Sequence, residues 1–235
     1  MCALPPFLLF DLDDTILNFD GVSDLCWQQL CETVAPQLGG VTAGGLMSAI
    51  QSARAWFWSD PARHRRGRLD LLTARRELVA WAFDRLGVCE PALSQAMADA
   101  YTEQREELVY PFAGAIESLR RFQDQGIRMG LVTNVMAASQ RKKIERFRLA
   151  EFFQIILIEG EFGVGKPDHR VFQFALEALQ APCHQAGMVG NDLEYDIRPA
   201  LELGMQAIWV DCAKSGLPAD SAIIPTRTIH SLAEL

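Results

Sequence analysis

Residues 7–15 read Phe-Leu-Leu-Phe-Asp-Leu-Asp-Asp-Thr, a short apolar run that ends in three acidic residues. A continuous apolar run of this length is typical of a central parallel strand that is buried on both faces. In open α/β sheets, ligands bind outside the carboxyl ends of the strands. We therefore expect Asp11 and Asp13 to lie where a ligand would sit.

The second half of the chain alternates apolar runs with amphipathic stretches. The expected strands are 127–133, 154–158, 186–190 and 205–210, and the expected helices are 113–125, 136–147, 168–179 and 197–203. Gly126 and Gly204 follow two of these helices, where glycine is a common stop signal. This alternation predicts the α/β class, with a Rossmann-like parallel sheet covered by helices on both faces.

Residues 20–108 follow a different pattern. Four amphipathic stretches predict helices, and no convincing strand interrupts them. They are 22–38, 43–58, 69–86 and 91–108, with a loop expected at 59–68. We therefore predict an all-helical domain, 20–108, inserted after the first strand of a core formed by 1–19 and 109–235.

Composition narrows the classes of protein. The 235 residues are 49% hydrophobic and 22% charged, as in ordinary globular proteins. A net charge of −8 opposes general binding to nucleic acid or to anionic membranes. The six cysteines are scattered without a CxxC pair, and the apolar start is too short to span a membrane. These features predict free thiols and a cytoplasmic location.

Two carboxylates at the spacing of Asp11 and Asp13 suit phosphoryl transfer. One can attack phosphorus, while the other gives a proton to the leaving oxygen and later takes one from water. A carboxylate approaching a phosphate meets a repulsion of about 4 kcal/mol per charge pair at about 4 Å. A bound Mg²⁺ would offset this repulsion. The alternative is that these acidic residues only cap a helix or form a turn.

Three later segments support the same chemistry. Thr133 and Asn134 end the second expected strand, where a hydroxyl and backbone N–H groups can hold phosphate oxygens. Lys166 lies in a turn before a helix and can neutralise a phosphoryl group, or it is an ordinary surface lysine. Asn191 and Asp192 follow the fourth expected strand and can complete a site for a hard cation, or they form a capped loop.

In this order, the segments Asp-x-Asp-x-Thr, Thr, Lys-Pro and Gly-Asn-Asp resemble the motif series of the haloacid dehalogenase-like (HAD) hydrolase superfamily, in its phosphatase branch. The helical insert resembles the first type of cap in that family. The resemblance implies that Asp11 is the nucleophile and Asp13 the acid/base, that Thr133, Asn134 and Lys166 bind phosphate, and that Asp11, the Asp13 carbonyl and Asn191 or Asp192 bind Mg²⁺.

The fourth segment departs from the family pattern. Many members have Gly-Asp at this point, whereas here Gly190 is followed by Asn191 and then Asp192. Either Asn191 supplies a neutral oxygen to the metal, or Asp192 reaches it. We favour Asp192, because an anionic ligand offsets more of the cost of desolvating a dication, and we expect Asp196 to orient waters or Lys166.

The resemblance implies a phosphatase for a small phosphorylated metabolite that acts through an aspartyl-phosphate. Residues 18–20, Asn-Phe-Asp, resemble the 5'-nucleotidase subgroup. The aromatic run Trp56 to Trp58 and the basic run Arg63 to Arg68 are either substrate contacts in the cap or a core segment followed by a solvated loop. The oligomeric state stays open.

Three other functions compete with this one. A phosphomutase would pass the phosphoryl group to a sugar on the same core. The family's 2-haloacid dehalogenases need no metal and commonly have Tyr where this chain has Asp13, whose carboxylate would be idle because a halide leaves without a proton. A nucleic-acid binding protein would use the Arg63 to Arg68 run, which the acidic net charge disfavours.

Overall fold

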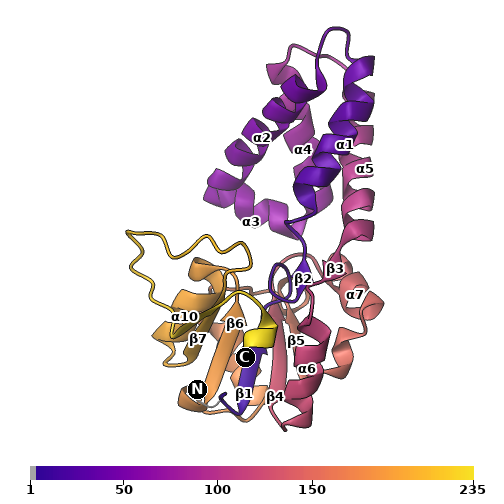
Figure 1. Cartoon of the computed structure of the whole chain (residues 1–235). Coiled ribbons are helices and arrows are strands. Elements are labelled where there is room, and N and C mark those ends of the chain that lie inside the picture. Colours follow the sequence, from indigo (N-terminus) through magenta and orange to yellow (C-terminus); the bar gives the residue numbers. More distant parts are fainter. Residues whose placement is uncertain (1–3) are drawn as a thin grey trace. The chain divides into compact units, whose positions relative to one another are not determined.

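The computed structural model describes residues 4–235, whose internal contacts divide the chain into two compact units (Figure 1). The first, called the core unit here, runs up to Asn18 and resumes at Tyr110–Leu235. The second, the cap unit, is Phe19–Val109. No helix among the described residues is both long and apolar enough to cross a membrane.

A six-stranded sheet forms the centre of the core unit (Figure 1). The strands are β1 (Phe7–Phe10), β4 (Arg128–Thr133), β5 (Ile155–Ile158), β6 (Ala186–Gly190), β7 (Gln206–Val210) and β8 (Arg227–Ile229). Their order is β5-β4-β1-β6-β7-β8, and every neighbouring pair is parallel. The predicted parallel α/β core is confirmed, and β8 is the one strand of this sheet that was missed.

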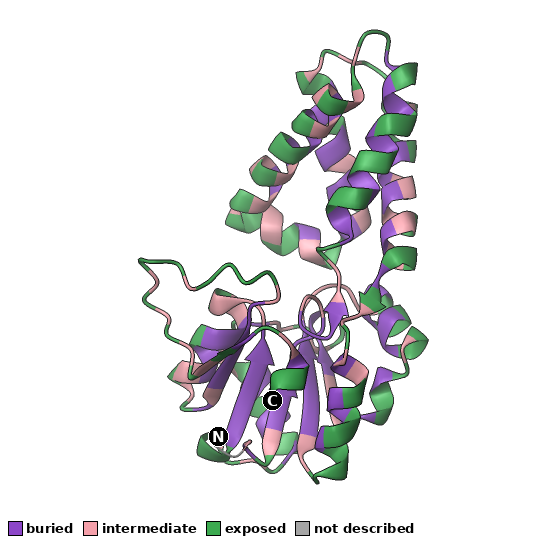
Figure 2. Ribbon diagram, viewed as in Figure 1, coloured by how far each residue is buried: buried purple, intermediate pink, exposed green. Residues whose placement is uncertain are grey.

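Helices cover both faces of this sheet. They are α6 (Ala115–Asp124), α7 (Ala137–Arg146), α8 (Glu159–Phe162), α9 (His169–Ala178) and α10 (Arg198–Glu202), with short 3₁₀ segments at Leu149–Glu151, Cys183–Gln185 and Leu232–Glu234 and a π-helical turn, η4, at Leu193–Ile197. Leu9 belongs to a buried cluster with Phe172 of α9, whereas Phe10 stacks on Phe122 of α6 with ring centroids 6.1 Å apart. Since consecutive strand residues point to opposite faces, α9 and α6 lie on opposite faces. Figure 2 shows the resulting burial of the strands.

Strand register brings the motif residues to one edge of the sheet. Phe10 of β1 is level with Leu131 of β4 and Val189 of β6. The backbone N–H of Asp11 donates to the carbonyl of Val189 at 2.9 Å, so the chain stays in the sheet up to the first acidic residue. The residues that follow all three strands therefore emerge side by side.

A two-stranded antiparallel pair lies where the insertion leaves and rejoins the core unit. It consists of β2 (Leu17–Asn18) and β3 (Tyr110–Pro111). The side-chain amide of Asn18 donates to the Tyr110 hydroxyl at 2.7 Å. This pair, which the sequence analysis did not anticipate, joins the two ends of the insertion within the core unit.

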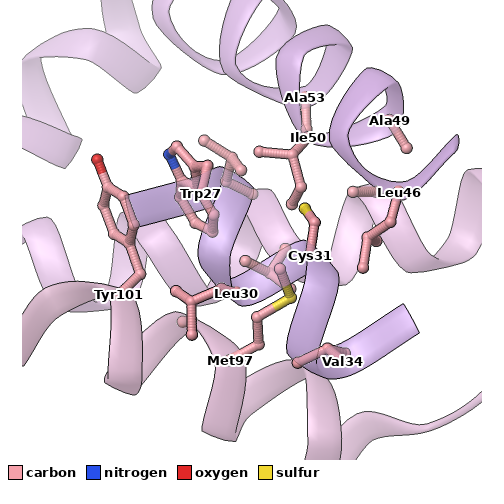
Figure 3. Close-up of a cluster of buried hydrophobic side chains, with 14 of the residues drawn as sticks. Trp27, Leu30, Cys31, Val34, Leu46, Ala49, Ile50, Ala53, Met97 and Tyr101 are labelled. Atoms are coloured by element: carbon pink, nitrogen blue, oxygen red, sulfur yellow. The ribbon is translucent and has the colours of Figure 1, made fainter. Parts of the chain in front are cut away.

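The cap unit is all-helical, as predicted. Its helices are α1 (Ser23–Val34), α2 (Ala43–Ser59), α3 (Pro61–Leu69), α4 (Leu71–Arg85) and α5 (Pro91–Leu108), with a 3₁₀ turn at Ala35–Gln37. The apolar faces of α1, α2, α4 and α5 enclose a core in which Trp27 of α1 stacks on Tyr101 of α5 with ring centroids 3.7 Å apart (Figure 3). Close stacking of two large rings adds to the free energy that their burial supplies.

The expected loop at 59–68 is wrong, because most of it forms α3. The side chain of Asp60 caps this helix by accepting from the backbone N–H of Arg63 at 2.8 Å, and Pro61 occupies the first turn. Both are favoured at helix N-termini. Gly67 is required at its position because a Cβ there would lie 2.5 Å from an atom of the Phe57 ring.

Two of the basic residues on α3, Arg63 and Arg66, have partners within the cap unit. Arg63 lies over the Trp56 ring at 4.3 Å and donates to the Trp56 carbonyl at 2.7 Å, and Arg66 pairs with Glu77 at 2.6 Å. Phe57 is fully buried and Trp56 is half-buried. The aromatic run thus belongs largely to the cap core. Cys26, Cys31, Cys89, Cys183 and Cys212 are free thiols, and Cys2 lies outside the described residues.

Candidate active site

The site is built on the loop that follows β1. This loop turns sharply, because the N–H groups of Ile16 and Leu17 both donate to the Leu12 carbonyl and Asp14 has a φ of 59°. Aspartate tolerates this left-handed conformation better than most residues do. The turn keeps Asp11, which is 7% exposed, at the end of the strand.

Lys166 joins two acidic residues that are far apart in the sequence. Its Nζ lies 2.5 Å from Oδ1 of Asp11 and 2.6 Å from Oδ1 of Asp196. All three residues are buried. Two carboxylates against one ammonium leave a net negative charge in a medium that solvates charge poorly.

The pKa values reflect this environment. Burial raises the pKa of Asp11 to about 7, against the lowering effect of Lys166, and the Asp196 charge adds to the rise. Burial likewise raises the pKa of Asp196 despite its contact with Lys166. Burial alone would lower the pKa of Lys166, but the two carboxylates raise it above its usual value. Lys166 is therefore cationic at neutral pH, as a residue that binds phosphate should be.

Asn134 holds Lys166 through its backbone. The Asn134 side-chain amide donates to the Lys166 carbonyl at 2.8 Å and accepts from the Lys166 N–H at 2.8 Å. Gly165 permits this approach, since a Cβ there would lie 2.6 Å from Oδ1 of Asn134. The Asn134 side chain, expected to bind phosphate, is thus engaged by Lys166 through both its nitrogen and its oxygen, and its amide nitrogen keeps a second N–H.

Asp13 lies against two residues of α7 that the sequence analysis did not single out. Nζ of Lys143 lies 2.6 Å and 2.7 Å from the two carboxylate oxygens of Asp13. The amide of Gln140 donates to Oδ2 of Asp13 at 3.0 Å and to the hydroxyl of Thr133 at 2.6 Å. Gln140 and Lys143 share the buried face of α7 with Ile144. Polar residues at core-facing helical positions were the signal available in the sequence.

The residues after β6 divide into two roles. Oδ1 of Asn191 lies 3.4 Å from the hydroxyl of Thr15, which also lies 3.3 Å from Oδ2 of Asp11. Oδ1 of Asp192 instead accepts from the N–H groups of Glu194 and Tyr195, both at 2.8 Å, and caps η4. The geometry thus favours Asn191 over Asp192 as a neighbour of Asp11, opposite to our preference from sequence.

Asp196 contacts Lys166, which is one of the two roles expected for it. It also accepts from the backbone N–H of Asp192 at 3.0 Å. Gly190 makes room for it, because a Cβ at Gly190 would overlap the Asp196 carboxylate. The glycine at the end of β6 is therefore needed for the contact between Asp196 and Lys166.

A metal ion at Asp11 would rely partly on neutral oxygens. Within residues 4–235, no three acidic, histidine or cysteine side chains gather as a metal site. The oxygens of Asp11 and Asn191 that approach Thr15 form a smaller donor set, and the cluster around Lys166 carries excess negative charge. Mg²⁺ typically takes one or two carboxylates and keeps several waters. This donor set and this charge fit such an ion.

Comparisons with known proteins identify the family. The chain matches the model for haloacid dehalogenase-like hydrolases over residues 76–210. It is 32% identical to phosphoserine phosphatase of Thermus thermophilus, with 97% of this chain and 96% of the relative aligned. It is 30% identical to pyrimidine 5'-nucleotidase YjjG of Escherichia coli, with 97% and 95% aligned. The chain belongs to the HAD-like hydrolase family, and these relatives confirm the prediction of a phosphatase.

Solved structures share the fold. The HAD-hydrolase YfnB of Bacillus subtilis, bound to magnesium, has a TM-score of 0.74 and 22% identity, covering 99% of this chain and 97% of YfnB. A 2-haloacid dehalogenase of Pseudomonas syringae pv. tomato has a TM-score of 0.62 and 24% identity, covering 99% and 96%. At these identities the likeness concerns the fold and does not distinguish the two chemistries.

Proposed function

We propose that this protein is a Mg²⁺-dependent phosphatase that hydrolyses a small phosphate monoester through an aspartyl-phosphate on Asp11. The observation that supports this most directly is the placement of Lys166 between Asp11 and Asp196. Asp13 lies two residues after Asp11 on the same loop. One carboxylate is thus paired with a cation that can also bind phosphate, and a second carboxylate is held separately by Lys143.

In the first step, a carboxylate oxygen of Asp11 bonds to phosphorus as the bond to the leaving oxygen breaks. That oxygen takes a proton from the Asp13 carboxyl. In the second step, water bonds to phosphorus, gives a proton to the Asp13 carboxylate, and the bond from Asp11 to phosphorus breaks. Inorganic phosphate leaves, and both carboxyl groups return to their starting states.

Lys166 and Thr133 would hold the phosphoryl oxygens in both steps. A preorganised ammonium that stays cationic stabilises the charge that develops on the transferring group. The Asp11 carboxylate, the Asp13 carbonyl and the Asn191 amide oxygen would hold Mg²⁺, with Asp192 as the alternative to Asn191. When bound, Mg²⁺ neutralises charge and orients the phosphate for in-line attack.

The substrate class follows from the relatives rather than from the site. The relatives at 32% and 30% identity are named for phosphoserine and for pyrimidine 5'-nucleotides, so a small phosphorylated metabolite is the class we propose. Nucleic acid and membrane are not part of this proposal. The five free thiols among residues 4–235 favour a reducing compartment such as the cytoplasm.

Dehalogenase and phosphomutase chemistry are less favoured. Asp13 is held by two buried side chains, and this arrangement has no use where a halide leaves without a proton. A phosphomutase would require the phosphoenzyme to resist water until a sugar arrives. Rapid hydrolysis of the phosphoenzyme in buffer would count against that reaction.

The proposal is tested with p-nitrophenyl phosphate and a panel of phosphorylated metabolites. We expect turnover with Mg²⁺, loss of turnover with a chelator, and recovery when Mg²⁺ is restored. Asp11→Asn should lower kcat by about 10³-fold or more, because it removes the nucleophile. Acid quenching should trap phosphate on the wild type and not on Asp11→Asn. Undiminished turnover by Asp11→Asn would remove Asp11 from the mechanism.

A further inference from the structure

Asp13, on the loop that follows β1, is contacted by two side chains of α7. Both of its carboxylate oxygens accept from Nζ of Lys143, and Oδ2 also accepts from the amide of Gln140. Lys143 and Gln140 are three residues apart on α7, so they lie on one face of that helix. The helix therefore approaches Asp13 with two donors at once.

These contacts are made by buried groups. Lys143 is 5% exposed and Gln140 is fully buried. Burying an ammonium is strongly destabilising unless an anion pairs with it, and an apolar side chain would fill the same space without that penalty. Pairing with Asp13 offsets the cost at Lys143, but it does not explain why a charge is placed there.

The amide of Gln140 is oriented with its nitrogen toward the site. Its nitrogen faces three acceptors, namely Asp13, the Thr133 hydroxyl and the Asn134 carbonyl at 3.1 Å. Its oxygen is buried and has no partner within the described part of the chain. Leaving a buried acceptor unpaired is destabilising. The amide thus bears this cost while it joins Asp13 to Thr133.

These contacts also separate the two carboxylates of the loop. Lys166 pairs with Asp11, whereas Lys143 pairs with Asp13. Each carboxylate has its own cation, carried by a different segment of the core unit. Lys143 can therefore be substituted while the cation that pairs with Asp11 is kept.

We propose that Lys143 and Gln140 are positioning residues that hold the Asp13 carboxyl group in line for both of its proton transfers and tie it to the phosphate-binding hydroxyl of Thr133. This inference rests on the proposed function, in which Asp13 protonates the leaving oxygen and then deprotonates water. A carboxyl group that is free to rotate spends less time in hydrogen-bond reach of either proton.

The proposal predicts a defect that depends on the leaving group. The weakly basic 2,4-dinitrophenolate can leave without being protonated, whereas the more basic phenolate needs a proton from an acid. For Lys143→Met we expect kcat/KM to fall about 10²-fold with phenyl phosphate and less than about 3-fold with 2,4-dinitrophenyl phosphate. With the dinitrophenyl ester, phosphoenzyme should accumulate as a burst, because the later proton transfer from water still needs Asp13.

Two variants and a control separate positioning from folding. Lys143→Arg keeps a donor for both carboxylate oxygens and should recover most of the loss with phenyl phosphate. Gln140→Met removes the link to Thr133 without a large change in side-chain volume. Its kcat/KM should also fall more with phenyl phosphate than with 2,4-dinitrophenyl phosphate, but by a smaller factor than in Lys143→Met. Lys142→Met, at an exposed position on the same helix, should match the wild type in rates and in Tm.

The outcomes distinguish this inference from the proposed function. Equal losses for all aryl phosphates, or a fall in Tm with an unchanged leaving-group dependence, would assign Lys143 and Gln140 a structural role and overturn the inference. Absence of a phosphoenzyme in the wild type, with Asp11→Asn still active, would instead overturn the proposed function. A steeper leaving-group dependence in both α7 variants, rescued by Lys143→Arg, would support the inference.

Discussion

The cluster of Asp11, Lys166 and Asp196 sets the charge at the centre of the site. Two buried carboxylates share one ammonium, and burial raises the pKa of Asp11 to about 7. A carboxyl group in this state binds a proton or a metal ion, but not both. Proton and metal binding at Asp11 are therefore linked.

This linkage predicts that Mg²⁺ affinity depends on pH. Below about pH 7, Asp11 is protonated in the metal-free protein, so Mg²⁺ must displace a proton, and the apparent Kd should rise by up to about tenfold for each pH unit below that value. Above about pH 7 the carboxylate is already formed and the affinity should level off. Titration calorimetry between about pH 5.5 and 8.5 at constant ionic strength measures this.

The control for this prediction is Asp11→Asn, which removes the titrating group and keeps the shape of the side chain. Its affinity should be weaker and nearly independent of pH in the same range. A wild-type affinity that does not change across that range would show that Asp11 does not ligate the metal.

At the scale of elements, α3 shows that capping residues can specify a helix that has no apolar stripe. Its sequence, Pro61–Leu69, is basic and has no hydrophobic periodicity, so the pattern that revealed the other helices was absent. The signals present were Asp60 at the N-cap and Pro61 in the first turn. Packing of Gly67 against Phe57 then fixes this helix within the cap unit.

The cap of α3 gives a stability prediction. Asp60→Ala leaves the N–H of Arg63 without its acceptor and should lower the free energy of unfolding by about 1 kcal/mol. Asp60→Asn keeps an acceptor and should lose much less. Urea unfolding followed by circular dichroism measures the difference, and equal stability of Asp60→Ala and wild type would mean that the cap does not hold α3.

At the scale of the whole molecule, the net charge of −8 opposes the basic run on α3. Arg63 donates to a backbone carbonyl and packs on Trp56, and Arg66 pairs with Glu77. Part of the positive charge is therefore used inside the cap unit. A site for polyanions needs cations that are free to meet phosphates.

We accordingly predict no salt-dependent retention of the full chain on DNA or RNA at physiological ionic strength. The charge of the whole protein should repel the polyanion, and elution should precede the start of a salt gradient. Column retention measures this, with a basic protein of similar size as the positive control. Retention that Arg65→Ala and Arg68→Ala together abolish would instead revive the binding-protein hypothesis.

Much of the fold and part of the site could be read from the sequence. The apolar runs ending in Asp11 and Thr133 are recognisable as strands, because a strand buried on both faces must be apolar. The end of each strand that faces a ligand is its carboxyl end, which follows from the chain direction. The helical character of the insert is likewise periodic in sequence. The residues at these strand ends are therefore predictable from the sequence.

The tertiary structure decided which of these residues meet and what they do. The contacts of Lys143 and Gln140 with Asp13 span 127 to 130 residues of chain, and the engagement of Asn134 by Lys166 spans 32. Whether Asn191 or Asp192 lies near Asp11 depends on which of the two side chains caps η4. Sequence periodicity reports on neighbours within one element, whereas such contacts depend on strand order and helix placement, which only the packed chain determines.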